Sequence, residues 1–141
     1  MKILVINGPN LNMLGIREPA IYGSQNFAAL ERFIRESANA IGVDVSLFQS
    51  NHEGEIVDVI QSAYGVFDGI VINPAAYTHT SVAILDALKA VSIPTVEVHI
   101  SDINSRDEFR RFSFVSLYAE KVYAGYGFDG YKMALEYLTG K

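Results

Sequence analysis

All three histidines of the chain stand in short polar segments that could carry out acid–base chemistry. The segments are 7–10 (Asn-Gly-Pro-Asn), 49–52 (Gln-Ser-Asn-His), 73–80 (Asn-Pro-Ala-Ala-Tyr-Thr-His-Thr) and 97–101 (Glu-Val-His-Ile-Ser). Imidazole titrates near neutral pH, so a histidine can both give and accept protons. Each segment follows or ends an apolar run, and we expect their side chains to meet at one site.

The individual residues of these segments each have two interpretations. Glu97 and His99 are two positions apart, which places both side chains on one face of a strand. A carboxylate there could orient the imidazole for proton transfer, but a simple surface pair has the same spacing. His79 could be an ordinary residue of a helix's first turn. Asn10 could bind a ligand, or could satisfy backbone groups in a turn beside a Gly-Pro pair.

A loop rich in glycine and proline carries a further candidate, Tyr22, with Arg17 in the same segment. A tyrosine phenol has a pKa of about 10 and is a poor base at neutral pH. A cation within about 4–6 Å favours the phenolate and lowers that pKa. Arg17, Arg106 and Arg110 are candidates for this cation, and the glycines flanking the segment suit a lid. The alternative is an exposed tyrosine packed on a loop proline.

Charged residues of two predicted helices are less distinctive. Arg106 and Arg110 would share one face of a short helix that opens with the capping-box spacing of Ser105 and Glu108. Such a pair could bind an anionic substrate, or could form a solvated face paired with nearby acids. Asp86 is the only acid of the apolar stretch 81–91, and position alone favours a solvent-facing role.

Apolar runs and segments of helical period alternate along the chain. Strands are predicted over 2–7, 43–48, 66–72, 95–98 and 121–124. Helices are predicted over 24–41, 53–64, 80–91 and 128–138. This alternation predicts an α/β fold, a flavodoxin-like open parallel five-stranded sheet with helices on both faces. In such sheets ligands bind beyond the carboxyl ends of the strands, where the four polar segments fall.

Composition narrows the class of protein. With 141 residues, half of them hydrophobic, we expect residues 1–141 to form a single domain. The net charge of −5 argues against broad binding of nucleic acid or of anionic membranes. No cysteine is present, which excludes disulfides, thiolate nucleophiles and zinc fingers. No apolar run approaches the length of a membrane span, and no signal peptide precedes the first strand, so we expect a cytoplasmic protein.

Several cofactor and nucleophile motifs do not occur in the sequence. The first turn has no Gly-x-Gly-x-x-Gly, and neither a phosphate-binding P-loop nor a Gly-x-Ser-x-Gly elbow occurs. No lysine falls at the carboxyl end of a predicted strand, which disfavours a Schiff base. The histidines and carboxylates lack compact metal-ligand spacing. Cofactor-free acid–base chemistry on Tyr, His, Arg and Asn remains.

Long and irregular motifs cover the chain nearly from end to end. They are 6–12 (Ile-Asn-Gly-Pro-Asn-Leu-Asn), 15–19 (Gly-Ile-Arg-Glu-Pro) with Tyr22-Gly23, 49–55 (Gln-Ser-Asn-His-Glu-Gly-Glu), 73–81, 97–101, 106–110 (Arg-Asp-Glu-Phe-Arg) and 130–131 (Gly-Tyr). Together they resemble the type II 3-dehydroquinate dehydratases (type II dehydroquinases). The resemblance implies elimination of water from 3-dehydroquinate to give 3-dehydroshikimate in the shikimate pathway, with no metal or organic cofactor. It also implies a homo-oligomer, a dodecamer built from trimers.

The resemblance assigns catalytic roles to five matched residues. Tyr22 would be the general base that removes a proton from C2, and Arg17 would keep it ionised. Asn10 would hold a water against the enolate that forms. His99, oriented by Glu97, would protonate the departing C1 hydroxyl in an anti elimination.

The resemblance also implies seven substrate-binding positions. They are Asn73 with the backbone amides of Ile100 and Ser101 for the carboxylate, His79 and Arg110 for ring hydroxyls, Arg106 on the closing side, and Asp86 from a neighbouring subunit.

Three other positions depart from the family's common pattern. Ala75 replaces a glycine, Asp102 an asparagine and Phe112 a frequent histidine. They bear on affinity more than on the type of reaction.

Two other functions are compatible with the predicted fold. One is a non-catalytic binding module for a small carboxylate, which the intact set of Tyr22, Arg17 and His99 disfavours. The other is a flavin-binding electron carrier, which the lack of a Ser/Thr-rich phosphate loop after the first strand disfavours.

Overall fold

A five-stranded parallel sheet forms the centre of the computed structural model, which describes residues 1–16, 25–105 and 107–140. The strands are β1 (Lys2–Asn7), β2 (Asp44–Gln49), β3 (Gly69–Asn73), β4 (Thr95–His99) and β5 (Lys121–Ala124). They lie in the order β2-β1-β3-β4-β5, and every neighbouring pair is parallel. The predicted open parallel sheet is confirmed, with the strand order of flavodoxin-like folds.

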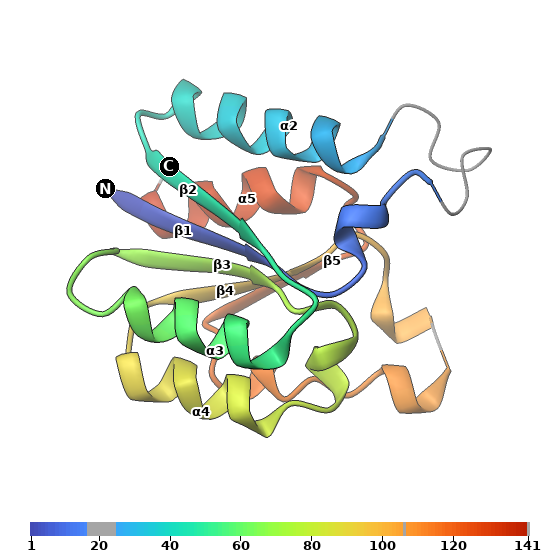
Figure 1. Ribbon diagram of the computed structural model, residues 1–141. Helices are drawn as coiled ribbons and strands as arrows, with labels where there is room; N and C mark the ends of the chain where they lie inside the picture. Colours follow the sequence, from blue (N-terminus) through green and yellow to red (C-terminus); the bar gives the residue numbers. More distant parts are fainter. Residues whose placement is uncertain (17–24, 106, 141) are drawn as a thin grey trace.

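Helices cover both faces of this sheet, as predicted. In the described part of the chain they are α2 (Phe27–Ala40), α3 (Glu53–Ser62), α4 (Val82–Val91) and α5 (Asp129–Thr139). Figure 1 shows α2 and α5 on one face and α3 and α4 on the other. None of the described helices is long and apolar enough to cross a bilayer.

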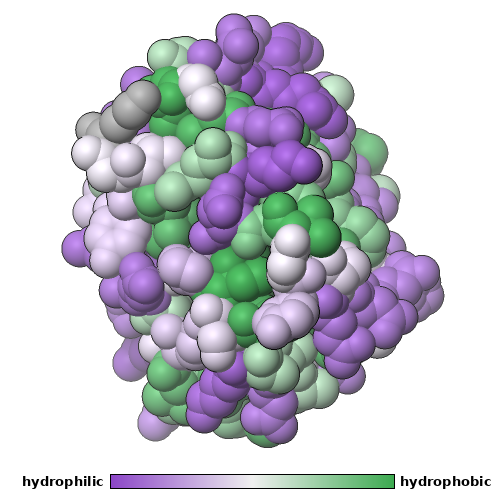
Figure 2. Space-filling model, turned by 90° about the vertical axis from the view of Figure 1, so that its left-hand side faces the viewer, coloured by the Kyte–Doolittle hydropathy of each residue, from purple (hydrophilic) through white to green (hydrophobic). Residues whose placement is uncertain are grey.

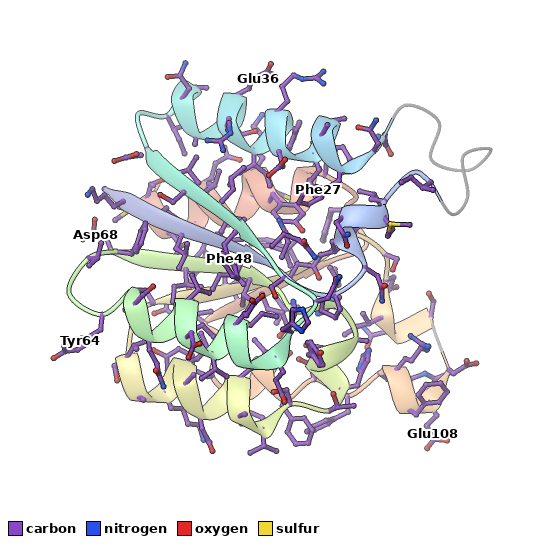
Figure 3. All side chains as sticks on the ribbon, viewed as in Figure 1. Phe27, Glu36, Phe48, Tyr64, Asp68 and Glu108 are labelled. Carbon is purple, nitrogen blue, oxygen red and sulfur yellow. The ribbon has the colours of Figure 1, made fainter. Side chains whose placement is uncertain are left out.

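Strand β1 shows why the sheet is buried on both sides. Its side chains alternate between two apolar cores: Ile3 and Val5 pack with α2 and α5, while Leu4 and Ile6 pack with α3 and α4. All four are at most 3% exposed. A continuous apolar run is what a strand covered on both faces requires. In Figure 3, Phe27 points from α2 toward the sheet and Glu36 points away from it, as an amphipathic helix should present them.

Two helices begin later than predicted because of the residues that cap them. The chain at 25–26 is not helical, and α2 begins at Phe27, where the Asn26 side chain accepts the N–H of Ala29 at 2.8 Å. The predicted start at position 24 is therefore wrong. Helix α4 begins at Val82 rather than at position 80, since the Ser81 hydroxyl accepts the N–H of Ile84 at 3.0 Å. In both cases the cap satisfies an N–H of the first turn.

The predicted short helix over the arginine segment is also wrong. Two separate 3₁₀ turns, Ile103–Ser105 and Glu108–Arg110, take its place. The Ser105 hydroxyl donates to the carbonyl of Asp102 at 2.8 Å, which lies before it in the chain. Arg106 lies outside the described residues, so the structure does not place it on a common face with Arg110.

The remaining boundaries differ by a few residues. Strand β3 begins at Gly69 rather than at 66, because Val66 and Phe67 both donate to the carbonyl of Ala63 and complete the turn after α3. Helix α3 ends at Ser62 rather than at 64. The other ends of the predicted strands and of the last helix agree within one residue, which is the usual uncertainty of an element end.

The loops after β1 and β3 approach each other more closely than any side chain would allow. The N–H of Gly8 donates to the carbonyl of Asn73 at 2.8 Å. A Cβ added to Gly8 would lie 2.5 Å from the carbonyl oxygen of Pro74, well inside van der Waals contact. Glycine is therefore required at position 8 by contact with the neighbouring loop.

We expect Gly8→Ala to lower the free energy of unfolding by roughly 1–3 kcal/mol, because the two loops must separate to admit the methyl group. Gly54→Ala is the matched control: position 54 lies in α3 with open space around it, and its stability should be unchanged or slightly higher. Urea unfolding of both variants measures the difference. An unchanged midpoint for Gly8→Ala would contradict the close approach of the loops.

Candidate active site

A cavity of about 310 Å³ opens beyond the carboxyl ends of β1, β3 and β4. The structure brings seven of the predicted site residues to its wall: Asn10, Asn73, His79, His99, Ile100, Ser101 and Arg110. They come from the last residues of β3 and β4 and from the segments that follow β1, β3 and β4, as expected for a parallel sheet. The opposite end of the molecule, where the strands begin, shows hydrophilic and hydrophobic residues interspersed (Figure 2).

Two of the predicted residues that the structure describes, Glu97 and Asp86, do not line this cavity. Glu97 lies behind His99 in the buried layer, and Asp86 is exposed on α4. Arg17, Tyr22 and Arg106 lie outside the described residues. Within the part of the chain that is described, no group of three or more histidine, aspartate or glutamate side chains is placed to hold a metal ion.

Glu97 and His99 form a buried pair at the end of β4. Glu97 is fully buried and His99 is 5% exposed. The Nε2 atom of His99 lies within hydrogen-bond distance of Oε2 of Glu97. The carboxylate can only accept, so Nε2 carries the proton and Nδ1 is the nitrogen left for a ligand. The period-two spacing on a strand therefore produces an oriented imidazole.

Three hydroxyl groups surround the Glu97 carboxylate: Thr78 stands in the predicted polar segment 73–80, whereas Ser113 and Ser116 were not predicted. The Ser113 and Thr78 hydroxyls lie 2.9 and 3.2 Å from Oε2, and the Ser116 hydroxyl lies 2.6 Å from Oε1. Serine and threonine are too common for their type to mark these positions, and the segment around 113–116 has neither a helical nor a strand pattern. Only the packing of this segment against β4 reveals them.

The donors determine the charge of Glu97. Burial alone raises the pKa of a carboxyl, because it removes the carboxylate from water. The hydrogen bond and positive charge of His99, then the Ser116 and Ser113 hydroxyls, outweigh burial and leave the pKa of Glu97 below its usual value. Glu97 is therefore a carboxylate at neutral pH and can stabilise a protonated His99.

His79 is oriented by a backbone group. Its Nδ1 lies 2.7 Å from the carbonyl of Phe112. A carbonyl only accepts, so Nδ1–H donates and the neutral ring presents Nε2 as an acceptor for a hydroxyl. The side chain at position 112 takes no part in this bond, so the departure from histidine to Phe112 leaves the orientation of His79 intact.

The polar segment after β2 supports the site without lining it. Gln49 Nε2 donates to the carbonyl of Gly8 at 3.1 Å, and Asn51 Oδ1 accepts the N–H of Asn10 at 3.0 Å. Asn10 itself has a φ of 71°, in the left-handed region that asparagine tolerates better than most residues. Segment 49–52 therefore shapes the Asn10 turn, and His52 is exposed outside the cavity wall.

Ala75 occupies a backbone conformation that favours glycine. Its φ is 52°, in the left-handed region where a Cβ approaches the following carbonyl. Its N–H donates to Oδ1 of Asn73 at 3.1 Å, which holds the turn in this shape. The alanine that departs from the family's pattern is thus a strained residue on the cavity wall.

The comparisons with known proteins agree on one family. The family model described as Dehydroquinase class II matches residues 1–139. Two curated relatives named 3-dehydroquinate dehydratase come from Endomicrobium trichonymphae (55% identical over 138 residues, 98% of this chain and 96% of the relative) and Clostridium acetobutylicum (54% identical over 138 residues, with the same coverage). The crystal structure of type II dehydroquinase from Butyrivibrio crossotus matches with a TM-score of 0.94 at 53% identity, covering 99% of this chain and 97% of that one.

We expect Ala75→Gly to raise the free energy of unfolding by roughly 0.5–1 kcal/mol, because relief of the left-handed strain exceeds the added entropy of the unfolded chain. Ala76→Gly is the control, since position 76 has no positive φ and glycine there should lower stability by roughly 0.5–1 kcal/mol. Urea unfolding measures whether the free energy of unfolding rises in Ala75→Gly and falls in Ala76→Gly. The same sign for both variants would count against strain at Ala75.

The lowered pKa of Glu97 predicts how stability depends on pH. Because the folded-state pKa lies below the unfolded value, ionised Glu97 stabilises the fold above the unfolded pKa, and this is lost as the pH falls through the folded pKa. The free energy of unfolding should therefore decline below about pH 4.3, the usual glutamate value. Glu97→Gln should flatten this decline and lower stability at neutral pH.

Urea unfolding over a pH series, with the exposed Glu36→Gln as control, measures this effect. The control should keep the parent's pH dependence. A parent-like decline in Glu97→Gln would refute the pKa assignment.

Proposed function

We propose a mechanism for this chain on the premise that it belongs to the class II dehydroquinase family and acts as a 3-dehydroquinate dehydratase, a hydro-lyase of the shikimate pathway. The reaction removes water from 3-dehydroquinate to give 3-dehydroshikimate, and the mechanism uses no metal or organic cofactor. The buried Glu97–His99 pair beside the cavity is the observation that carries it. It supplies a proton donor at a site whose other described lining residues are neutral or cationic.

The first step takes a proton from C2 of the substrate. Tyr22 as phenolate is the base, and Arg17 favours its ionised form. The electrons of the C2–H bond move into the carbonyl at C3, which becomes an enolate. A water held by Asn10, whose turn lies at the cavity wall, donates a hydrogen bond to the enolate oxygen.

The second step expels the C1 hydroxyl as water. Protonated His99 gives its Nδ1 proton to the hydroxyl oxygen while the C1–O bond breaks. The enolate electrons form the C1=C2 double bond and restore the ketone, so atoms and charge balance. Base and acid act on opposite faces of the ring, which gives an anti elimination, and the Glu97 carboxylate stabilises the imidazolium before the transfer.

Substrate binding uses the neutral and cationic groups of the wall. The carboxylate is bound by Asn73 and by the backbone amides of Ile100 and Ser101, which follow β4 directly. Ring hydroxyls are bound by Nε2 of His79 and by Arg110. Arg106 closes the site.

A neighbouring subunit completes the site through Asp86, which its exposed position on α4 supports. We propose that residues 1–141 act as one catalytic domain within a dodecamer built from trimers. Exposed apolar side chains such as Val82, Phe109 and Leu117 are surface that an assembly would cover. The pathway of aromatic amino acid biosynthesis favours a cytoplasmic location.

We expect the purified protein, mixed with 3-dehydroquinate alone, to produce a saturable rise in near-ultraviolet absorbance, since only the product is a conjugated enone. The rise should survive chelator and borohydride.

Tyr22→Phe should lower kcat by about 10²–10⁴-fold, the range of a general base, while binding of the substrate is retained. Arg17→Ala should move the onset of activity to higher pH.

Tyr126→Phe, an exposed tyrosine outside the cavity wall, is the control and should keep full turnover. Full activity of Tyr22→Phe would remove Tyr22 from the role of base. Binding without any absorbance change in the parent protein would favour the non-catalytic carboxylate-binding module.

A further inference from the structure

Tyr131 of α5 is a fully buried tyrosine whose hydroxyl lies between two asparagines of the sheet. Asn7 ends β1, Asn73 ends β3, and the two are directly paired in the parallel register. Both follow residues of the core beneath α2 and α5, Val5 and Val71, by two positions, so their side chains point to the face that α5 covers (Figure 1).

The hydrogen-bond directions in this cluster follow from one backbone group. The N–H of Ala75 can only donate, so the Asn73 atom 3.1 Å from it is the oxygen Oδ1. The Nδ2 of Asn73 then donates to the Tyr131 hydroxyl at 2.9 Å. Burial raises the pKa of Tyr131, so the hydroxyl keeps its proton and donates it to Oδ1 of Asn7 at 2.6 Å.

This chain of bonds leaves Asn73 with one orientation. A flip of its amide would place an N–H against the N–H of Ala75, and the flipped carbonyl would compete with Asn7 for the single proton of the Tyr131 hydroxyl. Oδ1 already accepts the N–H of Ala75, whereas the second N–H of Nδ2 has no protein partner among the described residues. Asn73 therefore has an unused N–H donor for the cavity that it lines.

We propose that Tyr131 is a positioning residue that holds Asn73 as a hydrogen-bond donor toward the substrate carboxylate. This inference rests on the proposed function, in which Asn73 binds that carboxylate. An amide oxygen turned to the same place would repel the anion, so the Tyr131 hydroxyl contributes to selecting an anionic group at this position. Tyr131 does not line the cavity and acts only through Asn73.

Tyr131→Phe tests the proposal in the intact protein. It removes the acceptor of Asn73 Nδ2 and the donor to Asn7, so the N–H of Ala75 is the one partner among the described residues that still holds the Asn73 amide. We expect KM for 3-dehydroquinate to rise about tenfold, as loss of one hydrogen bond to a charged group predicts. The kcat should change less than about twofold, because the groups that transfer protons stay in place.

Tyr118→Phe is the matched control. Tyr118 is a half-buried tyrosine whose hydroxyl donates to the carbonyl of Ile93 at 2.9 Å, outside the cavity wall. Tyr118→Phe removes the same hydroxyl group and a comparable hydrogen bond. We therefore expect Tm to fall in both variants and KM to rise only in Tyr131→Phe.

If Tyr131→Phe does not fold, Asn7→Ala removes the other hydrogen-bond partner of the Tyr131 hydroxyl. We expect it to raise KM about threefold, which is less than in Tyr131→Phe because the bond between Tyr131 and Asn73 remains.

A double-mutant cycle with Asn73→Ala separates positioning from structure. The proposal expects Tyr131→Phe to raise KM in the parent and to have no further effect once Asn73 is alanine. Two results would overturn the role of Tyr131 and leave that of Asn73 standing. One is an equal rise in KM on Tyr131→Phe with and without Asn73→Ala. The other is an unchanged KM in Tyr131→Phe while Asn73→Ala alone raises KM. An unchanged KM for Asn73→Ala would overturn the assignment of Asn73 to the carboxylate as well.

Discussion

The buried carboxylate of Glu97 is the interaction on which the arrangement of the site depends. An ionised carboxylate in a dry core is costly unless donors surround it. His99 from the same strand and the hydroxyls of Ser113 and Ser116 donate to it, and the Thr78 hydroxyl, 2.6 Å from that of Ser113 and 3.2 Å from Oε2, completes the network. These hydrogen bonds connect the turn after β3 and the segment before β5 to the end of β4. The orientation of His99 is a consequence of that packing.

A second polar network lies on the other face of the same sheet. Glu97 and His99 point toward the layer of α3 and α4, since their neighbours Val96 and Val98 belong to the core under α2 and α5. Asn7 and Asn73 point toward α5, where Tyr131 joins them. The two networks meet only at the carboxyl ends of the strands, where the apolar layers stop. One network orients His99, the proposed proton donor, and the other orients Asn73, the group proposed to bind the carboxylate.

Close backbone approach is the cost of bringing these loops together. Gly8 touches the backbone of Asn73 and Pro74, and Ala75 adopts a positive φ immediately after them. Both features lie at the junction of β1 and β3, between the two polar networks. Conformational strain at such a junction is tolerated because hydrogen bonds on both sides, from Gly8 N–H and Ala75 N–H, hold it in place.

The sequence by itself determined the alternation of strands and helices, the parallel sheet, and the placing of Asn73, His79 and His99 at its carboxyl end. These follow from local periodicity and from the rule that parallel strands end together. The spacing of Glu97 and His99 was equally local. The start of α2 also depends on a local contact, the cap that the Asn26 side chain forms with the N–H of Ala29. Only the tertiary structure brought Ser113 and Ser116 to Glu97 and Tyr131 to Asn7. Tyr131 and Asn7 are 124 positions apart in the chain. Contacts at such separations depend on how whole layers pack, and no periodic pattern in the chain records them.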